Sequence, residues 1–463
     1  MKHNDFDLLT DPIPRLLRRL AVPVGTGLFF NTMFNVVDTF YGGLISTQAL
    51  AALSLAFPVF FLIIAVGAGI SMGSAALLGH ALGSGRREEA ELYAAQAISF
   101  GIVHGLLLAV AGSVAAPILF KLLGATGEYQ AMTVRYMRTL FCGTVFFVVN
   151  HVLNAILSAT GDTRSFRNFL IGGFFLNLLL DPWLMYGWLG VPALGLAGIG
   201  WATVAIHLLG NAYLLTRAAR TGLLSRHSWA QLLPRAEPFR RIAGQGFPAS
   251  LNMLTVAVGI FVIIWYVGRF GKEAVAAFGI ATRIEQIALL PAMGLNMATL
   301  TLVAQNFGAR FPERVRQTVR TAMTAGTAIM AFGTPVIFLA AGPLMGLFSK
   351  DPTVVEVGTV YLRIEVFVFV AYVVIYVNNS ALQGLQKPFF ALWIGLLRQI
   401  AGPLLVFHLL AYRLGWGLLG IWWGIFLITW LAAGVSIYYT RRVVLTLCRE
   451  AEAVLPSLDP NAV

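Results

Sequence analysis

Charged residues are scarce in this chain of 463 residues. Asp, Glu, Lys and Arg make up 11% of it, whereas hydrophobic residues make up 58%. Soluble domains carry about 25% charged residues, so the composition excludes an ordinary soluble protein and predicts a polytopic membrane protein. Cysteine is scarcer still. With Cys142 and Cys448 alone, the sequence excludes a disulfide framework and a cysteine-rich metal site.

The sequence signatures of the common enzyme classes are missing as well, apart from one match that we discard. Gly69-Ile-Ser-Met-Gly fits the nucleophile-elbow pattern, but that pattern needs a strand–turn–helix, and here it lies within an apolar span. We find no glycine-rich phosphate-binding loop, no soluble segment large enough for a nucleotide-binding domain, and no nucleophile–base pair at span depth. The seven histidines are scattered without the spacing of metal ligands. We therefore expect neither an enzyme nor ATP-driven transport, with no cofactor and no metal beyond a coupling ion.

Long apolar runs are what the sequence has instead. A helix needs about 20 apolar residues to cross a bilayer, and counting such runs between polar breaks predicts about twelve transmembrane helices. The expected fold class is an all-α polytopic membrane protein. The expected spans are 14–44, 50–82, 92–122, 131–159, 165–188, 194–219, 238–268, 275–306, 313–346, 356–381, 388–412 and 417–441.

The net charge of +12 is carried by short loops between the apolar runs. The longest loop, from Arg217 to Arg241, is the most basic, whereas loops such as LLGATGEYQ and FSKDPTVVEVG are poor in base. This is the positive-inside pattern, so we interpret the charge as topology and not as nucleic-acid binding. Both ends of the chain are basic, which predicts that both are cytoplasmic and that the number of spans is even.

The two halves of the chain repeat each other. At a constant shift of 225 residues, Pro23 aligns with Pro248 and Tyr41 with Tyr266, and Tyr136-Met-Arg aligns with Tyr361-Leu-Arg. Six spans per half in the same orientation predict a parallel repeat related by an axis along the membrane normal. The predicted division is an N-lobe of helices 1–6 over residues 1–220, a basic cytoplasmic linker over 221–237, a C-lobe of helices 7–12 over 238–445, and a tail over 446–463.

Two carboxylates lie inside the N-terminal spans. Asp38 is in the first, and Asp181 is in the fifth, four residues after Asn177 and hence on the same helical face. An aspartate at the centre of a span costs about 2.5–3.5 kcal/mol, and ionisable residues at that depth are functional candidates. The second half has Ile263 in place of Asp38, and Gly402 or Leu404 near the position of Asp181. The fold therefore does not require these acids.

If the face with Asn177 and Asp181 meets Asp38, the three side chains form a site for one small cation. Hard oxygen ligands suit sodium. Alternatively, two nearby carboxylates in a dry site do not both ionise easily, so that one holds a proton. A purely structural role stays open, above all for the neighbouring polar residues, because such residues commonly bond across membrane helices. These neighbours are Tyr136, Asn154 and Thr203.

The C-terminal half has ionisable residues of its own. We interpret Glu285 and Arg398 as an ion pair between two spans, with a scaffold role. Arg363 and Glu365 lie early in their span, so we expect them near an interface, where long side chains reach water.

Pro23 lies in the span that carries Asp38. Proline removes a helical hydrogen bond and kinks the helix, so a hinge that responds to the state of Asp38 is one interpretation. Because Pro248 occupies the same position in the other half, a packing kink is the alternative.

Several motifs together resemble the multidrug and toxic compound extrusion (MATE) family. They are P-x(14)-D-T-F-Y-G-G, GHALGSGRREEA, SATGDTR, LNLLLDPWLMYG, GIGWATV and QNFGAR. The resemblance covers essentially the whole chain and is greatest to the prokaryotic DinF-like branch, whose cation site is in the N-lobe. It implies that the cation-site positions are Asp38, Asn177, Asp181 and Thr203, that the surrounding network includes Tyr136 and Asn154, and that the bending proline is Pro23.

The resemblance further implies two pseudo-symmetric six-helix lobes (a MATE/MOP-type fold), a central cavity and alternating access. It implies a monomer in the cytoplasmic (inner) membrane of a prokaryote that exports amphipathic, often cationic compounds in exchange for H⁺ or Na⁺. Of the acids that another branch carries in its C-lobe, only Glu285 is a loose counterpart. An apolar, aromatic cavity wall suits flat cations, and its expected members are Phe29, Phe30, Phe34 and Phe147.

Other functions fit the sequence less well. A flippase for lipid-linked substrates needs a basic cavity, whereas the intramembrane charges of the N-terminal half are acidic. A structural or receptor protein leaves these acids unexplained, and a fixed pore does not suit a kinked, two-lobed repeat.

Overall fold

The protein is helical throughout the part that the structure, a computed structural model, describes, namely residues 6–188, 190–224 and 231–454. Within these ranges nine helices are long and apolar enough to cross a membrane, or twelve if each of three bent pairs forms one span. The predicted all-α fold with about twelve spans is thus confirmed. Parts of the predicted linker and tail lie outside the described residues.

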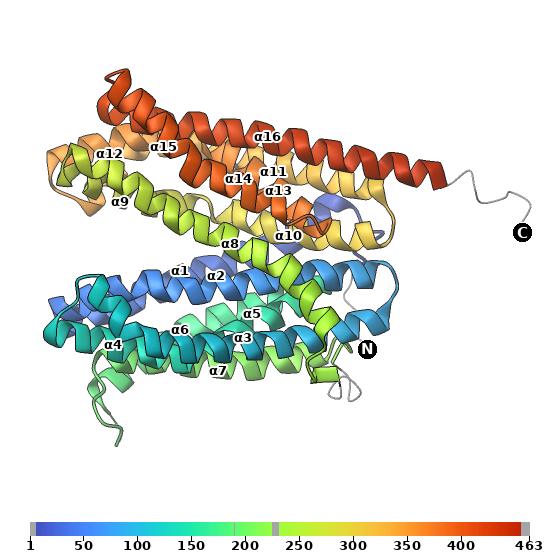
Figure 1. Ribbon diagram of the computed structural model, residues 1–463, viewed down its shortest axis with the longest axis horizontal. Helices are drawn as coiled ribbons and strands as arrows, with labels where there is room; N and C mark the ends of the chain where they lie inside the picture. The colour runs from blue at the N-terminus through green and yellow to red at the C-terminus, as the bar shows by residue number, and fades with distance from the viewer. Residues whose placement is uncertain (1–5, 189, 225–230, 455–463) are drawn as a thin grey trace, which may run out of the picture. The chain divides into compact units, whose positions relative to one another are not determined.

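The helices follow the predicted spans closely (Figure 1). The first half has α1 Ile13–Ile45, α2 Thr47–Gly83, α3 Arg87–Leu122, α4 Gly127–Cys142, α5 Thr144–Ala159, α6 Arg164–Tyr186 and α7 Leu196–Ala219. The second half has α8 Ala236–Val267, η2 Gly268–Phe270, α9 Lys272–Ala288, α10 Leu290–Gly308, α11 Pro312–Phe348, α12 Pro352–Glu365, α13 Phe369–Gly384, α14 Phe389–Leu396, η3 Leu397–Ala401, α15 Gly402–Phe407, η4 His408–Arg413 and α16 Gly417–Val454.

Three spans are broken by a bend. The bends are 45° between α4 and α5, 48° between α9 and α10, and 52° between α12 and α13. Pro291 lies in the first turn of α10, where proline is tolerated. Because proline has no backbone N–H to donate, it does not continue the preceding helix α9. The repeat places Val66 at the equivalent position of α2, and α2 runs on unbroken. The repeat is therefore one of topology and not of every helix axis.

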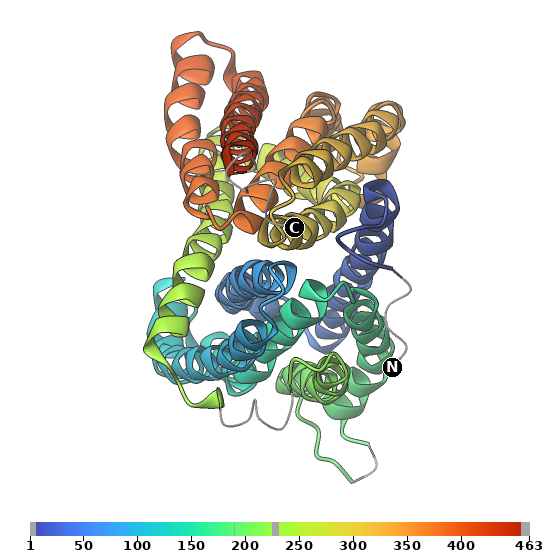
Figure 2. The same cartoon turned by 90° about the vertical axis from the view of Figure 1, so that its right-hand side faces the viewer.

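The chain forms two compact units, and each contains helices of one half running side by side (Figure 2). Unit 2 is Thr26–Ser250, in which α5 packs against α2, α3 and α7. Unit 1 combines Met1–Gly25 with Leu251–Val463, and in it α13 packs against α10, α11 and α16. The chain thus passes from one unit to the other inside α1 and again inside α8.

The first part of α1 is anchored in unit 1. A Cβ atom added to Gly294 of α10 would lie 2.5 Å from the carbonyl oxygen of Ala21, so only glycine permits this close approach. Before the helix begins, Arg314 Nη2 donates to the carbonyl of Asp11 at 2.8 Å. The first part of α8 is held in unit 2 in the same way, since Gly69 of α2 lies directly against the backbone of Gly246.

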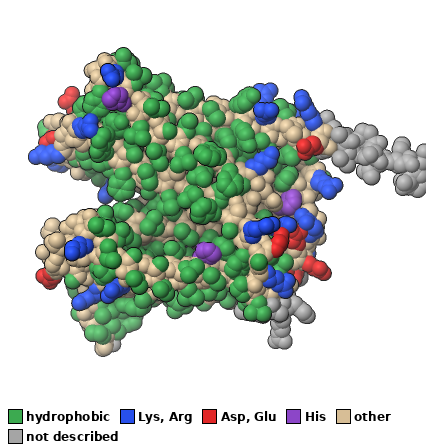
Figure 3. All heavy atoms as spheres, viewed as in Figure 1, with side chains coloured by type: hydrophobic (Ala, Val, Ile, Leu, Met, Phe, Trp, Pro, Cys, Tyr) green, Lys and Arg blue, Asp and Glu red, His purple; other side chains and the backbone are tan. Residues whose placement is uncertain are grey.

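Apolar side chains cover the middle of the helices on the face drawn in Figure 3, and charged side chains gather near the helix ends. Large hydrophobic residues of both units are exposed, for example Val114 (71%) and Phe332 (79%). Such extended apolar surface is typical of contact with lipid.

Candidate cation site

Helix α6 presents Asn177 and Asp181 on one face in unit 2. The four-residue spacing places them one above the other, and both side chains are fully buried. The helix ends at Gly187, which caps it in the left-handed region with φ of 79°. Leu184 of the same turn lies against α7, because a Cβ atom added to Gly198 would be 2.6 Å from the Leu184 carbonyl oxygen. The acidic face of α6 is thus fixed by close backbone packing.

The second part of α1 is fastened to α6 by a tyrosine. The Tyr41 hydroxyl donates to the carbonyl of Leu178 at 3.1 Å, and Asp38 lies one turn before Tyr41. Asn177 then bridges the two acids, because its Nδ2 donates to Asp38 Oδ1 and to Asp181 Oδ1, each at 2.9 Å. The structure brings together the three residues that the sequence singled out first.

The bridged acids leave acceptor oxygens without donors. Among the described residues, neither Asn177 Oδ1 nor Asp181 Oδ2 has a hydrogen-bond partner, although both atoms are buried. Since the two bonded carboxylate oxygens share one nitrogen, they are less than about 6 Å apart. Two buried negative charges at that distance repel strongly. The chemistry of the cluster therefore suits one positive charge, a proton or a small hard cation.

The other predicted polar residues are buried but bond elsewhere. Thr203 Oγ1 donates to the Ile199 carbonyl of its own helix at 3.0 Å, and Asn154 Oδ1 accepts from Ser158 within α5 at 3.2 Å. Tyr136, Asp38 and Asp181 all lie within the described residues, and no hydrogen bond joins Tyr136 to either acid. The Thr203 oxygen keeps lone pairs for a cation, so its predicted role stays a prediction.

The expected aromatic wall is only partly open. Phe29 is 42% exposed, whereas Phe34 (9%) and Phe147 (4%) are buried. Their rings pack on His207, with centroid distances of 6.4 and 4.6 Å. Phe30 packs edge-on against Phe29 at 5.7 Å. Phe34 and Phe147 thus belong to the packed interior of unit 2 in this structure, contrary to the cavity role expected for them.

His207 was not singled out by the sequence. It lies one turn after Thr203, and its Nδ1 lies 2.9 Å from the Thr203 carbonyl oxygen. The four-residue spacing from Thr203 was the available signal. Among the described residues, however, no group of three His, Cys, Asp or Glu side chains is arranged to hold a metal ion.

Unit 1 repeats the frame of this site without its acids. The Tyr266 hydroxyl donates to the Leu404 carbonyl at 3.3 Å, as Tyr41 does to Leu178. Counting three residues on from each carbonyl, the counterpart of Asp181 is Phe407, which is fully buried. The expected counterparts Gly402 and Leu404 are therefore wrong by a few positions, because the shift is 226 residues at this point. An apolar ring fills the place of the acid.

The expected ion pair of Glu285 and Arg398 is not formed. Glu285 Oε2 instead accepts from the Tyr361 hydroxyl at 3.1 Å, and the Arg398 guanidinium lies 5.1 Å from the ring centroid of Tyr372. Each of the two charged side chains thus contacts a tyrosine, Tyr361 or Tyr372, and not the other charged side chain.

Glu365 was expected near an interface, and this expectation is wrong. Its side chain is 1% exposed, and Oε1 accepts from Tyr372 at 3.1 Å. Glu365 is the last residue of α12 and so lies at the break of a bent span. The count of apolar residues placed the start of this span at residue 356, whereas α12 begins at Pro352. Glu365 is therefore further from the start of the span than we expected.

Pro23 lies inside α1, two residues before the chain passes from unit 1 into unit 2. Asp38 lies beyond that point. Whether the helix bends there stays a prediction.

Comparison with known proteins gives a consistent result. The family model MatE matches residues 23–183 and 248–407, one match in each half. The FAD transporter of Shewanella oneidensis is 31% identical over 85% of this chain and 87% of its own. A probable multidrug resistance protein NorM of Thermotoga maritima is 25% identical over 89% of both chains.

Solved structures share the fold. A crystal structure described as MATE in the bent conformation superposes with a TM-score of 0.90 at 24% identity, covering 96% of this chain and 98% of the other. The straight conformation gives a TM-score of 0.89 over 97% and 100%. The chain therefore belongs to the multidrug and toxic compound extrusion family, whose members are multi-pass membrane transporters and not enzymes.

Proposed function

We propose that this protein is a secondary active exporter of amphipathic, often cationic compounds, driven by H⁺ or Na⁺ that binds between Asp38 and Asp181. The observation that carries the proposal is the Asn177 bridge between two buried acids. A single amide cannot balance two carboxylates, and the remaining oxygens without donors suit a cation. Thr203 would add a further oxygen ligand.

Antiport requires that ion and substrate oppose each other. Ion binding removes net charge from the cluster and so changes which arrangement of α1 and α6 is favoured. By linkage, a substrate that lowers ion affinity has its own affinity lowered by the ion to the same degree. Bending at Pro23 would be one way for the state of Asp38 to reach the rest of α1. Inward ion flow would then drive outward substrate release.

The oligomeric state, the membrane and the orientation of the protein are part of the proposed function. We infer a monomer in the cytoplasmic membrane of a prokaryote with both chain ends in the cytoplasm, following the positive-inside pattern of the loops. Its partners would be small-molecule substrates and the bilayer, without a cofactor.

The test is ethidium efflux from proteoliposomes, driven first by a pH gradient alone and then by a sodium gradient alone. We expect one of the two gradients to drive efflux and Asp38→Asn to abolish it. Glu285→Gln is the control, since it also neutralises an acid of a span, a partly buried one in the other half. Unchanged gradient-driven efflux by Asp38→Asn at equal protein level would contradict the proposal.

A second candidate substrate is a flavin dinucleotide. The relative of Shewanella oneidensis, named as an FAD transporter, is 31% identical over 85% of this chain. FAD is amphipathic with flat rings, but it carries negative charge. The same vesicles loaded with FAD decide between the candidates. Gradient-driven loss of FAD without loss of ethidium would favour flavin export.

A further inference from the structure

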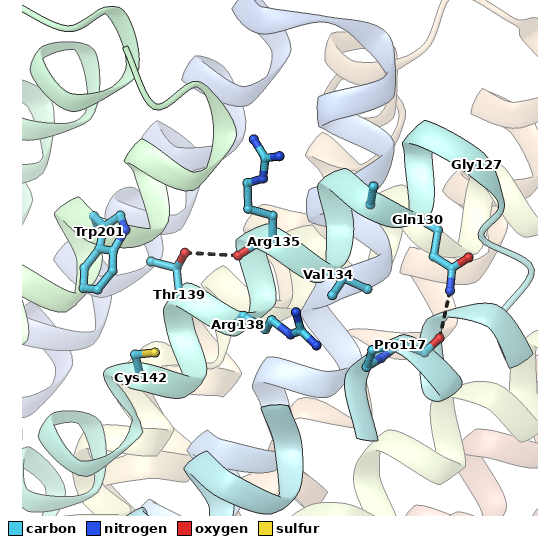
Figure 4. A pocket seen from close by; sticks show the side chains of 10 residues that line it. Pro117, Gly127, Gln130, Val134, Arg135, Arg138, Thr139, Cys142 and Trp201 are labelled. Atoms are coloured by element: carbon cyan, nitrogen blue, oxygen red, sulfur yellow. Dashed lines mark hydrogen bonds between the residues drawn. The ribbon is translucent and has the colours of Figure 1, made fainter. Parts of the chain in front are cut away.

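A cavity with two arginines opens on unit 2, away from the acids. It has a volume of about 630 Å³ and lies between α3, α4 and α7 (Figure 4). Gln130 Nε2 of α4 donates to the carbonyl of Pro117 of α3 at 2.9 Å and so fixes one wall. The lining also includes Arg135, Arg138, Cys142 and Trp201.

Neither guanidinium group has a protein partner in the part of the chain that the structure describes. Arg135 and Arg138 are exposed, Figure 4 draws their side chains extending from α4 without a bond, and no ion pair or hydrogen bond of either guanidinium is found among the described residues. The repeat makes the contrast clear. Arg363, the counterpart of Arg138, lies 5.4 Å from the ring centroid of Phe338, and the counterpart of Arg135 is Val360.

The length of the span places the two arginines near the boundary between hydrocarbon and headgroups. The span from Gly127 to Ala159 contains about 50 Å of helix at 1.5 Å per residue. Its 45° bend shortens the end-to-end distance to about 45 Å, whereas the hydrocarbon core is about 30 Å thick. If the span stands upright and the excess is shared equally, each end extends about 7 Å beyond the core. Along the axis of the span, Arg135 and Arg138 follow the start of α4 by about 11 and 15 Å. Their backbones therefore lie about 4 and 8 Å inside the hydrocarbon, from where a long side chain reaches the phosphate level.

We propose that this cavity binds the phosphate of an anionic phospholipid. Arginine presents a planar fork of donors that fits phosphate oxygens, and the cavity offers two such groups without competing acids among its lining residues. By the positive-inside pattern, the lipid belongs to the outer leaflet, since α4 begins at Gly127, within the base-poor stretch LLGATGEYQ.

The surroundings favour a lipid over a soluble phosphate. Val114 and Val110 precede Pro117 by three and seven residues, on the same face of α3, and they are 71% and 66% exposed. An acyl chain beside the cavity would lie along this face. Trp201, 43% exposed, adds the amphipathic ring that is enriched at membrane–water interfaces.

The test counts the bound lipid directly. The protein is placed in nanodiscs of phosphatidylcholine with increasing phosphatidylglycerol, and native mass spectrometry of the released protein counts the bound phosphatidylglycerol.

We expect phosphatidylglycerol to stay bound to the wild-type protein. Arg135→Gln with Arg138→Gln should weaken this binding about fivefold per arginine, hence about thirtyfold for the pair. The charge-conserving pair Arg135→Lys with Arg138→Lys should bind more weakly than wild type but more strongly than the glutamine pair, because it keeps the charge and loses the planar fork. Arg363→Gln should change nothing.

Several outcomes would overturn the proposal. Equal retention of phosphatidylcholine and phosphatidylglycerol would show no preference for anionic lipid. Binding of millimolar glycerol phosphate in place of the lipid would identify a soluble phosphate site instead. If the glutamine pair does not fold, the wild-type titration and the lysine pair still decide, because absence of bound phosphatidylglycerol in wild type is itself a contradiction.

Discussion

Tyr41 donates its hydroxyl hydrogen to the backbone carbonyl of Leu178, and this bond sets the register between α1 and α6. Tyr266 makes the same bond to Leu404 in the other half. Two halves with diverged sequences thus keep one helix–helix register. Within it, one half places acids where the other places Ile263 and Phe407. The register therefore belongs to the scaffold and does not depend on the acids.

Removing this bond should therefore separate stability from transport. Tyr41→Phe and Tyr266→Phe should each cost about 0.6 kcal/mol, the average for interhelical bonds in membranes. Only Tyr41→Phe should also weaken ion-driven efflux, because only α1 carries Asp38. Melting temperature in detergent and efflux from vesicles are the two measurements. Equal efflux defects in both variants would contradict a site confined to unit 2.

Asp181→Asn should impair transport without impairing the fold. The carboxylate is fully buried, and one of its oxygens has no donor, so neutralising it removes an unbalanced charge. We expect an unchanged or higher melting temperature and at least about a tenfold loss of efflux, which corresponds to about 1.4 kcal/mol of lost ion binding. A large fall in melting temperature with normal efflux would mean that Asp181 is structural.

Asn177→Leu should damage the site differently. The side chain is similar in size, but both acids lose their common donor, and each such loss in a buried setting costs about 1–3 kcal/mol. We expect lower stability together with a changed dependence of efflux on the coupling ion. Asn150→Leu is a control, since Asn150 is also a buried asparagine of unit 2 and bonds Asn211 at 2.9 Å without contacting the acids. If both variants gave the same ion dependence, the bridge would have no special role.

The acids of unit 1 should tolerate neutralisation better than loss of their tyrosines. Tyr372→Phe removes the donor to the fully buried Glu365 and should destabilise the protein by about 1–3 kcal/mol. Glu365→Gln keeps an acceptor for the same hydroxyl and should leave the choice of driving gradient unchanged. The measurements are thermal melting and efflux under each gradient. Loss of all ion coupling in Glu365→Gln would place a coupling site in this half as well.

The sequence predicted the acidic cluster because two independent signals agreed. The four-residue spacing put Asn177 and Asp181 on one face, and the repeat showed that Asp38 had no counterpart. Both signals depend only on local geometry and on comparison within the chain. The bond of Asn177 to both acids at once depends on how α1 and α6 meet, which no spacing within one helix reports.

Helix breaks account for the errors in the other half. Glu365 ends α12 at a bend of 52°, and Arg398 lies in the π-helical turn η3. Neither irregularity has a signal in hydropathy, because apolar residues continue on both sides. Phe34 and Phe147 were misjudged for another reason. An aromatic side chain suits a cavity wall and a packed interior equally well, and His207 decides for packing.

The N-terminal segment Met1–Gly25 belongs to the compact unit formed by the C-terminal half, and this affects how the protein is synthesised and folded. Unit 1 needs the segment before Gly25, which leaves the ribosome more than 200 residues earlier than Leu251. Until the second half is synthesised, the apolar side chains of that segment, such as Leu16 and Leu20, lack the partners that bury them. Each half, expressed alone, would be an incomplete module. Complete folding of this protein thus requires both halves of the chain. Co-expressed halves should recover function, whereas single halves should not.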